Sequence, residues 1–511
     1  MKSIIAHPIL TCKQASEFES TLLNNDQNRI WEAMSSVGYA LTQEILINFQ
    51  ESFPFPNNAT VLLLLGKGHN SGDTLLAASN LLDHFPNTKI FLYFTLGKDN
   101  LKPLVQKSLD VLTQKTTVIE ITSLSSIQSQ TFTLCIDGIL GMSFTPPLRE
   151  PIIEIINTIN KNANILFRAA VDIPSGLSES GGDTCFQADF TYATGVAKTP
   201  LFNTEFKNAI GRIRYLDIGF FKDPQSAPST NHFILHKDTL KSLSTFRNPN
   251  TDKRHYGHLL VLAGSIRYPG ALVMALKVAA SSGVGLLTAC ALESFIPSFA
   301  PHIPESMWLP MPQTPSGTID YLGKHEILQI LPKISAILIG PGLGDASETH
   351  QLIHELVKSQ NIPMIIDASA LTSELTCALQ ERPRNFARII LTPHPGEFLR
   401  LAGEGNDLLQ WSQNINVTTL LKGPHSQIAH DNTLYINTYG GPLLARGGSG
   451  DILSGLIGGL LAQTPQAPLT AVSKAVLWHS LTADYLARHQ GQVATHTTQL
   501  IPNLHKALRE I

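Results

Sequence analysis

The chain has 511 residues, 43% of them hydrophobic and 15% charged, so it is long enough for two domains that each bury a full core. A formal net charge of -3 at pH 7 gives no electrostatic reason to expect nucleic acid or an anionic membrane as a partner. The five cysteines are widely spaced and form no CxxC pair, which argues against a disulfide framework or a zinc site and favours a cytoplasmic location.

The first residues, MKSIIAHPILTC, superficially suggest a secretion signal. Their apolar run is broken by His7 and Pro8 and is too short for one, so we expect a poorly ordered leader. The longest apolar stretch, from Ala271 to Leu292, approaches the length of a membrane span. Because it contains Lys277 and a Gly-Val-Gly break, it predicts a buried helix followed by a buried strand, and no membrane span.

Short apolar runs that end in glycine-containing loops predict buried strands in the first half of the chain. They lie within 60–73, 89–97, 133–141 and 167–176, with helical patterns at 74–85 and 151–162 between them. Strands that alternate with helices predict a parallel sheet covered on both faces. The expected fold of this half is a Rossmann-like three-layer α/β/α domain.

Two polar stretches, 221–233 and 247–257, interrupt this rhythm and indicate a domain boundary near residue 230. We therefore divide the chain into residues 1–227 and 228–511. The alternation resumes at 257–265, 336–344, 363–371, 388–397 and 418–423, which predicts a second α/β domain. In parallel sheets ligands bind outside the carboxyl ends of the strands, where the glycines and carboxylates of both halves cluster.

The loop GKGHNSGD is not a dinucleotide fingerprint. Its glycines at 66, 68 and 72 are spaced GxGxxxG instead of GxGxxG, and the next strand lacks an acidic residue to hold a ribose. This disfavours a Rossmann dehydrogenase. A P-loop is disfavoured as well, because no glycine run is followed by GK[ST] at the required distance.

The stretch LLARGGSGDILSGLIGGLLAQ places small residues from Gly447 to Gly450 before a helix predicted over Asp451–Leu461. The free amide groups at such a helix start can hold the phosphoryl group of a nucleotide. A carboxylate at this position should stay ionised and can accept the proton of an attacking hydroxyl. The alternative is that Asp451 is an ordinary helix-start residue after a tight turn.

Several motifs agree in order with known families. GGPLLARGGSGDILSG, GHLLVLAGSIRYPGALVMALKVAASSGVGLLT, IGPGLG, LTPHPGE and LLKG together resemble the ADP/ATP-dependent NAD(P)H-hydrate dehydratases of the ribokinase-like superfamily, over about residues 230–505. GKGHNSGD, IDGILG, VDIPSG and DIG resemble the NAD(P)H-hydrate epimerases, over about residues 10–220. Since these families occur fused in bacteria, the whole chain resembles a bifunctional nicotinamide-nucleotide repair enzyme.

The resemblance implies that the C-terminal domain is a ribokinase-like α/β domain. It also implies that this domain phosphorylates the S epimer of NADH or NADPH hydrate with ADP or ATP. Loss of phosphate then restores the ring double bond. Asp451 is the implied base, and Glu397 either holds Mg²⁺ or its water, or caps a helix. The implied nucleotide-binding residues are Lys422, Gly423, Pro424, His425, Ser426, Gly448, Ser449 and Gly450; the implied contacts with the hydrated dinucleotide are Ala271, Gly342, His394 and Asp451.

For the N-terminal domain, the resemblance implies interconversion of the R and S epimers. Asp172 takes the acid/base position beside Lys198, although a strand-end aspartate can also simply accept loop amides. The implied K⁺ ligands are Asn70, Asp137 and Ser175, and the implied substrate-binding residues are His69, Asn70, Ser71, Gly72, Asp73, Gly141 and Asp172.

The chain departs from both family patterns. In the C-terminal half, Ser369 replaces the second aspartate of DADAL, and Gly441 and Arg446 replace an asparagine and a threonine; we interpret Arg446 as an added positive charge for phosphate. In the N-terminal half, Ser71 and Thr74 replace two glycines, and Arg149 lies three residues after the expected arginine.

These N-terminal changes predict weakened substrate binding and hence a weak, potassium-dependent epimerase. Two other functions stay open, a ribokinase-like small-molecule kinase and a dehydratase whose N-terminal domain is a catalytically lapsed binding module. We also expect a homo-oligomer. The sequence does not distinguish ADP from ATP, or NADH hydrate from NADPH hydrate.

Overall fold

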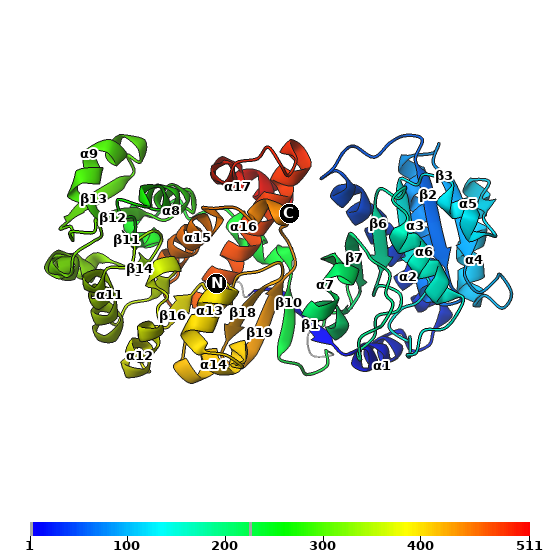
Figure 1. The fold of residues 1–511 in the computed structure, drawn as a ribbon, viewed down its shortest axis with the longest axis horizontal. Helices are drawn as coiled ribbons and strands as arrows, with labels where there is room; N and C mark the ends of the chain where they lie inside the picture. The colour runs from blue at the N-terminus through cyan, green and yellow to red at the C-terminus, as the bar shows by residue number, and fades with distance from the viewer. Residues whose placement is uncertain (1–3, 224–226) are drawn as a thin grey trace. The chain divides into compact units, whose positions relative to one another are not determined.

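The computed structural model describes residues 4–223 and 227–511, which form two compact units. One unit comprises residues 7–234, and the other comprises residues 235–511 with the first residues of the chain up to Ala6. Each unit is an α/β fold built on a largely parallel sheet (Figure 1), so the predicted fold class is confirmed.

The sheet of residues 7–234 is parallel and has the strand order β4-β3-β2-β5-β6-β7-β9. Its strands are β2 (Thr60–Leu65), β3 (Lys89–Phe94), β4 (Ile119–Glu120), β5 (Leu134–Gly138), β6 (Arg168–Val171), β7 (Phe190–Thr194) and β9 (Arg212–Leu216). A short parallel pair joins β1 (Ala6–Leu10) to β8 (Ala197–Lys198). The helices are α1 (Cys12–Leu23), α2 (Gln27–Phe49), α3 (His69–His84), α4 (Pro103–Lys115), α5 (Leu124–Gln128), α6 (Ile152–Lys161) and α7 (Lys207–Ile210).

Strand β2 shows why this sheet is covered on both faces. Val61, Leu63 and Leu65 pack against α2, α3 and α4, whereas Leu62 and Leu64 pack against α6. Because successive side chains of a strand point to opposite faces, an unbroken apolar run is buried on both. The three-layer arrangement predicted for this half therefore follows directly from the residues of its central strands.

The sheet of residues 235–511 has the order β13-β12-β11-β14-β15-β16-β17-β18-β19, parallel up to β17 and antiparallel beyond it. Its strands are β11 (His258–Leu262), β12 (Leu286–Leu292), β13 (Ser306–Met311), β14 (Ala336–Ile339), β15 (Met364–Ile366), β16 (Ile389–Leu391), β17 (Thr418–Leu421), β18 (Ser426–His430) and β19 (Thr433–Asn437); β10 (His232–Leu235) precedes them. The helices are α8 (Pro269–Ser281), α9 (Ile296–Phe299), α10 (Lys324–Ile330), α11 (Ser347–Ser359), α12 (Ser373–Glu381), α13 (Pro395–Ala402), α14 (Leu408–Ile415), α15 (Ser449–Gln463), α16 (Pro468–Gln490) and α17 (Leu500–Arg509).

Helix α15, which carries Asp451, is buried against α8. A Cβ atom at Gly455 would lie 2.5 Å from the carbonyl oxygen of Ala275, and one at Gly459 would lie 2.0 Å from Ser282 Oγ. These two glycines let the helices approach closely, which fixes the start of α15 relative to the sheet.

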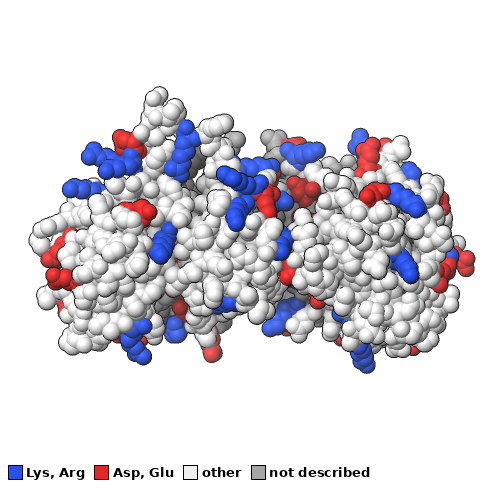
Figure 2. Space-filling view, turned by 90° about the horizontal axis from the view of Figure 1, so that it is seen from above, with Lys and Arg blue, Asp and Glu red and all other residues white. Residues whose placement is uncertain are grey.

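The apolar stretch 271–292 is α8 followed by β12, as predicted, and no helix in residues 4–223 and 227–511 is long and apolar enough to cross a membrane. The expectation of a disordered leader is wrong for the residues that the structure describes. Ile5 donates its amide to Thr239 Oγ1 at 2.9 Å and accepts from the amide of His236 at 2.9 Å, and β1 follows at once. Figure 2 shows basic and acidic side chains interspersed over one face of the molecule.

Candidate active sites of the two units

In the C-terminal unit, loops that follow neighbouring parallel strands are tied together at one edge of the sheet. The amide of Gly264, after β11, donates to Pro341 O at 2.8 Å. Ser369, after β15, donates its hydroxyl to Gly340 O at 3.0 Å, and the amide of Lys422 donates to Pro393 O at 2.8 Å. The predicted site residues of this half therefore come from loops that share one rigid edge.

Lys422 is the centre of the charged groups at this edge. Its Nζ lies 2.8 Å from Asp367 Oδ1 and 4.0 Å from Glu397 Oε2. A Cβ atom at Gly450 would lie 3.5 Å from the same Nζ, so the ammonium lies against the first turn of α15. Burial lowers the pKa of Lys422, but Asp367, Glu397 and Asp451 outweigh it and raise the pKa overall. Lys422 is therefore a firmly charged cation beside Asp451.

Asp451 lies in the first turn of α15. Burial raises the pKa of its carboxyl to about 6; the negative charge of Asp367 adds to the rise and Lys422 opposes it. The carboxylate is thus still ionised at neutral pH, as the sequence indicates, but it binds a proton more strongly than an ordinary aspartate. A partly buried carboxylate of this kind suits the role of a general base.

The loop before α15 leaves its backbone uncovered. Gly448 precedes the helix with φ of 87°, and its hypothetical Cβ would meet Met274 Sδ at 2.6 Å, so a side chain there would be strained and would displace the Met274 side chain. A Cβ atom at Gly447 or at Gly423 would meet nothing within 4 Å. Ser426 donates its hydroxyl to Gly423 O at 3.2 Å, which closes the turn that also contains Pro424 and His425. Phosphoryl oxygens can therefore approach the free amides of α15.

Three residues predicted to contact the dinucleotide lie in the same unit. A Cβ atom at Gly342, where φ is 65°, would lie 2.8 Å from Ala271 Cβ, so these two residues adjoin. His394 caps α13: its Nδ1 accepts from the amides of Gly396 and Glu397, and Glu397 Oε2 accepts the amide of His394 at 2.8 Å. The capping alternative for Glu397 is thus realised.

The guanidinium of Arg446, which we interpreted from the sequence as an added positive charge for phosphate, is directed at the backbone of the segment after α16. This guanidinium donates to the carbonyl oxygens of Thr495 at 2.6 Å, Gln492 at 2.7 Å and Val493 at 2.8 Å. Thr497 Oγ1 donates to Gly447 O at 3.0 Å. Arg446 therefore attaches the segment after α16 to the glycine loop.

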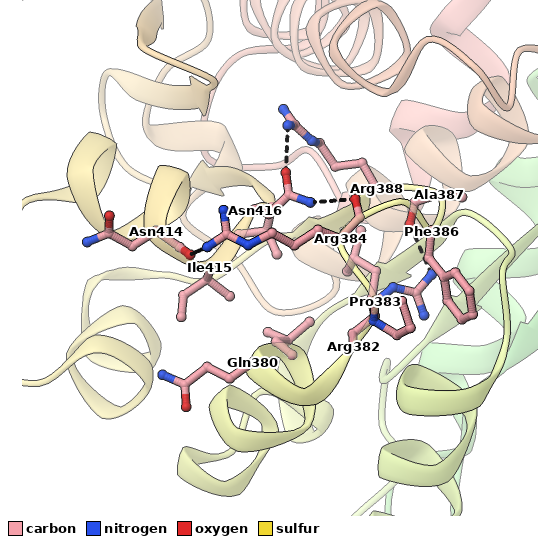
Figure 3. A pocket seen from close by; sticks show the side chains of 13 residues that line it. Gln380, Arg382, Pro383, Arg384, Phe386, Ala387, Arg388, Asn414, Ile415 and Asn416 are labelled. Carbon is pink, nitrogen blue, oxygen red and sulfur yellow. Dashed lines mark hydrogen bonds between the residues drawn. The ribbon is translucent and has the colours of Figure 1, made fainter.

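A cavity of about 90 Å³ lies elsewhere in this unit and is rich in arginine (Figure 3). Its lining includes the residues just before β16 and β17, so it opens at the amino ends of these strands, away from Asp451. Arg384 donates to Asn414 O at 3.1 Å, and Arg388 donates to Asn416 Oδ1 at 2.8 Å (Figure 3). Arg382 donates to four backbone carbonyl groups. These hydrogen bonds hold the surrounding loops together.

In the N-terminal unit, a cavity of about 350 Å³ lies at the carboxyl ends of the strands. Polar and charged side chains line this cavity from helices α1 and α3, from strands β7 and β8, and from the loop that follows β6. They include Glu19, His69, Asp73, Asp172, Thr194 and Lys198. Asn70 and Gly141 also line this cavity.

Asp172 and Lys198 form a buried ion pair in this cavity. Lys198 Nζ lies 2.5 Å from Asp172 Oδ1 and donates to Thr194 O at 2.9 Å, and Thr194 Oγ1 donates to the same Asp172 oxygen at 3.2 Å. Asp172 has φ of 68°, a backbone conformation that residues other than glycine rarely adopt. Such strain is concentrated at functional sites, which favours the acid/base role of Asp172 over a purely structural one.

The structure brings the three predicted potassium ligands together. Asp137 is fully buried and accepts hydrogen bonds from Ser175 N at 2.8 Å and Ser175 Oγ at 2.6 Å. Leu140 N donates to Ser175 Oγ, and Asn70 Nδ2 donates to Leu140 O at 2.9 Å. Burial raises the pKa of Asp137 to about 6, partly offset by these hydrogen bonds, and within the described residues no basic side chain pairs with it. A buried carboxylate without a cationic partner fits a nearby cation.

The substituted glycines of the α3 loop do not obstruct the cavity. Ser71 Oγ donates to Gly138 O at 2.9 Å and Thr74 Oγ1 donates to Asn70 O at 2.8 Å, and both side chains are fully buried. Neither residue lines the cavity, nor do Gly72 and Arg149. Any contact of Ser71 or Gly72 with a substrate must therefore come from the backbone.

Sequence reasoning missed two residues of these sites. Asp367 is the first residue of the DASAL segment, which was recognised, but only its ion pair with Lys422 indicates that it belongs to the site. Glu19 lies on α1, a helix that the strand and glycine patterns did not predict. Its only signal is an acidic residue following the buried Ala15 and Phe18 on an amphipathic helix.

Comparison with known proteins matches both halves. Residues 259–506 match the family model described as NAD(P)H-hydrate dehydratase, and residues 32–200 match that of the YjeF-related protein N-terminus. The chain is 30% identical over 520 residues to the bifunctional NAD(P)H-hydrate repair enzyme of Thermosynechococcus vestitus, covering 98% of this chain and 97% of that protein. The chain belongs to the family of bifunctional NAD(P)H-hydrate repair enzymes.

Another member of this family, from Moorella thermoacetica, is 29% identical over 500 residues, covering 94% of this chain and 92% of that protein. Among solved structures, an ADP/ATP-dependent NAD(P)H-hydrate dehydratase of Bacillus subtilis, co-crystallised with ATP and Mg²⁺, is 27% identical with a TM-score of 0.46 and covers 54% of this chain and 97% of its own. The two family models and the full-length relatives confirm the resemblance identified from the sequence: the chain is a nicotinamide-nucleotide repair enzyme with an epimerase and a dehydratase part.

Proposed function

We propose that the C-terminal unit dehydrates the S epimer of NADH or NADPH hydrate at the expense of ADP or ATP, with Asp451 as the base. The observation that carries this proposal is the position of Asp451 at an uncovered helix start, beside Lys422 and Asp367. Membership of the repair-enzyme family supports the substrate, and the name of the B. subtilis protein supports the nucleotide.

The proposed chemistry uses the groups at the start of α15. Asp451 takes the proton of the ring hydroxyl while the hydroxyl oxygen attacks the terminal phosphoryl group of the nucleotide. The amides of Gly448 and Gly450 and the ammonium of Lys422 stabilise the charge on the phosphoryl oxygens, whereas the amide of Ser449 already donates to Arg446 O at 3.3 Å. The ring nitrogen lone pair then expels phosphate to give an iminium, and loss of a proton from the adjacent ring carbon restores the double bond.

Asp367 and Glu397 are the proposed residues for Mg²⁺. Both carboxylates lie within 4.0 Å of Lys422 Nζ, and two carboxylates with nucleotide phosphates form a donor set that Mg²⁺ accepts. When bound, Mg²⁺ would neutralise phosphate charge.

For the N-terminal unit we propose epimerisation of the R and S hydrates in the 350 Å³ cavity, with Asp172 as the acid/base group paired with Lys198. Asn70, Asp137 and Ser175 are the proposed residues for K⁺, which would balance the buried charge of Asp137 when bound. The inward orientation of Ser71 and Thr74 supports an active epimerase over a lapsed binding module. A cytosolic location and a homo-oligomeric state stay predictions of the sequence.

The test is to incubate the full chain with a mixture of NADH hydrate epimers, ADP or ATP, and Mg²⁺, and to follow the nicotinamide absorbance. We expect complete recovery of NADH with one orthophosphate released for each molecule repaired. Accumulation of a stable phosphate ester would instead identify a small-molecule kinase. Recovery of only the S fraction would show that the N-terminal unit is inactive.

A further inference from the structure

The cavity of the N-terminal unit contains a second carboxyl group that contacts Lys198. Glu19 Oε1, on α1, lies 3.7 Å from Lys198 Nζ. The Lys198 side chain is only 1% exposed, whereas the Glu19 side chain is 21% exposed and lines the cavity. Lys198 therefore interacts with two carboxyl groups, Asp172 at 2.5 Å and Glu19 farther away.

The balance of charge in this cavity requires a retained proton. Asp73, on α3, is also buried, and its Oδ1 has no hydrogen-bond partner. Within the group formed by Glu19, Asp73, Asp172 and Lys198, three ionised carboxylates against one ammonium would leave a net charge of about -2, which is strongly unfavourable in a buried site. Lys67 and Lys102 also line the cavity, but neither is among the charges that act on Glu19 or Asp73. The Cys12 thiol is close enough to Asp172 and Lys198 to feel their charges. Burial raises the pKa of this thiol to about 12, so the thiol remains neutral.

Glu19 is one of the groups that carry this proton. Burial, followed by the charge of Asp172, raises the pKa of Glu19 to about 7, although Lys198 opposes the rise. Burial, with Asp172 and Glu19, raises the pKa of Asp73 well above its ordinary value. Glu19 thus changes charge near neutral pH at the one ammonium that pairs with Asp172.

We propose that Glu19 is a positioning residue of the epimerase site, which competes with Asp172 for the Lys198 ammonium and so sets how basic Asp172 is toward the substrate. This inference rests on the proposed epimerase function. When Glu19 is protonated, Lys198 neutralises Asp172 alone and makes it a weak base. When Glu19 ionises, the ammonium is shared, and Asp172 gains proton affinity from a second nearby negative charge. The epimerase rate should therefore rise as pH increases through about 7.

The kinetic test compares Glu19→Gln with the wild-type full chain, using the isolated R epimer across this pH range. We expect the pH-dependent rise in kcat to disappear and kcat above neutral pH to fall about tenfold, with little change in KM. Glu17→Gln is the matched control, because Glu17 lies on the same helix with a side chain 67% exposed. Glu19→Asp keeps the charge and should restore part of the rise. An unchanged pH profile in Glu19→Gln overturns the proposal.

A second measurement does not depend on epimerase activity. A carboxyl whose pKa is higher in the folded state than its model value of 4.5 stabilises the fold at low pH, and this contribution is lost as pH rises through about 7. Calorimetric unfolding should therefore show a smaller loss of stability between about pH 5 and pH 8 for Glu19→Gln than for the wild type.

An identical pH dependence of unfolding in the two proteins contradicts the coupling of Glu19 to this cluster. If the wild type has no epimerase activity, the proposed function of the unit fails, and the calorimetric comparison alone decides whether Glu19 is linked to Lys198 and Asp172.

Discussion

Lys422 Nζ lies 2.8 Å from Asp367 Oδ1, and this ion pair places one cation and one carboxylate beside the first turn of α15. Asp367 is almost fully buried and Lys422 is partly exposed, so the ammonium can face both the protein and a bound phosphate. The same pair acts on Asp451 in opposite directions, since Asp367 raises its pKa and Lys422 lowers it. We therefore expect the proposed dehydratase site to depend on this ion pair as well as on Asp451, the proposed base.

Asp451→Asn should lower nucleotide-dependent dehydration by about 10²–10⁴-fold while nucleotide binding persists, because an amide keeps the shape of the side chain but cannot accept the hydroxyl proton. Absorbance recovery gives the rate, and calorimetric titration with ADP or ATP gives the affinity. Asp431→Asn is the control, since Asp431 is an exposed partner of Arg388. Normal turnover by the Asp451 variant would remove Asp451 from the mechanism.

The dehydratase should lose activity as pH falls through about 6, because Asp451 must be ionised to accept a proton. Asp367→Asn removes a negative charge that raises the pKa of Asp451, so this loss should move to lower pH. The pH dependence of kcat/KM in both proteins tests the shift. A loss at the same pH in both would mean that another group controls it.

The strands could be predicted because most are short runs of consecutive apolar residues, and such a run can be recognised without knowing its neighbours in space. The glycine loop before Asp451 was also recognised from its local composition, which predicts a helix start with free amides, although an ordinary tight turn stayed an alternative. Asp367 and Glu19 were not assigned roles, because their importance depends on distances to Lys422 and Lys198, which are remote in sequence. The hydrogen bonds of Arg446 could not be predicted for the same reason, because its partners lie 46 to 49 residues further along the chain.

The structure changes the expectation for the substituted loop of the epimerase. Ser71→Ala should destabilise the fold by about 1 kcal/mol, because the buried acceptor Gly138 O loses its hydrogen bond, but it should leave KM for the hydrate unchanged. His69→Ala is the comparison, since His69 is exposed and lines the cavity, and it should raise KM. Denaturant unfolding and epimerase kinetics separate the two effects. A lowered KM in Ser71→Ala would restore the original expectation that the added side chain weakens substrate binding, and a raised KM would show that the side chain contacts the substrate.

Epimerase activity should depend on K⁺, and Asp137→Asn should remove this dependence. The amide carries no charge to balance a cation, and it cannot accept from both the amide and the hydroxyl of Ser175 as the carboxylate does. The measurement is epimerase rate and thermal unfolding in K⁺ and in a bulky organic cation. Stabilisation by K⁺ that is equal in the wild type and in Asp137→Asn would place the cation elsewhere.

Two roles for Arg446 can be distinguished: a positive charge that binds phosphate, as the sequence suggested, and a structural contact with the segment after α16. If its charge serves the phosphate, Arg446→Lys should retain nucleotide affinity and Arg446→Thr should lose it. The guanidinium instead donates from two nitrogen atoms to the three carbonyl oxygens of Gln492, Val493 and Thr495, a geometry that the single nitrogen of lysine does not match. Both variants should therefore be destabilised, by about 1 kcal/mol because the site is largely exposed, and both should expose the segment 491–497 to proteolysis while nucleotide affinity changes little. Loss of affinity in the threonine variant alone would show that the charge itself acts on the nucleotide.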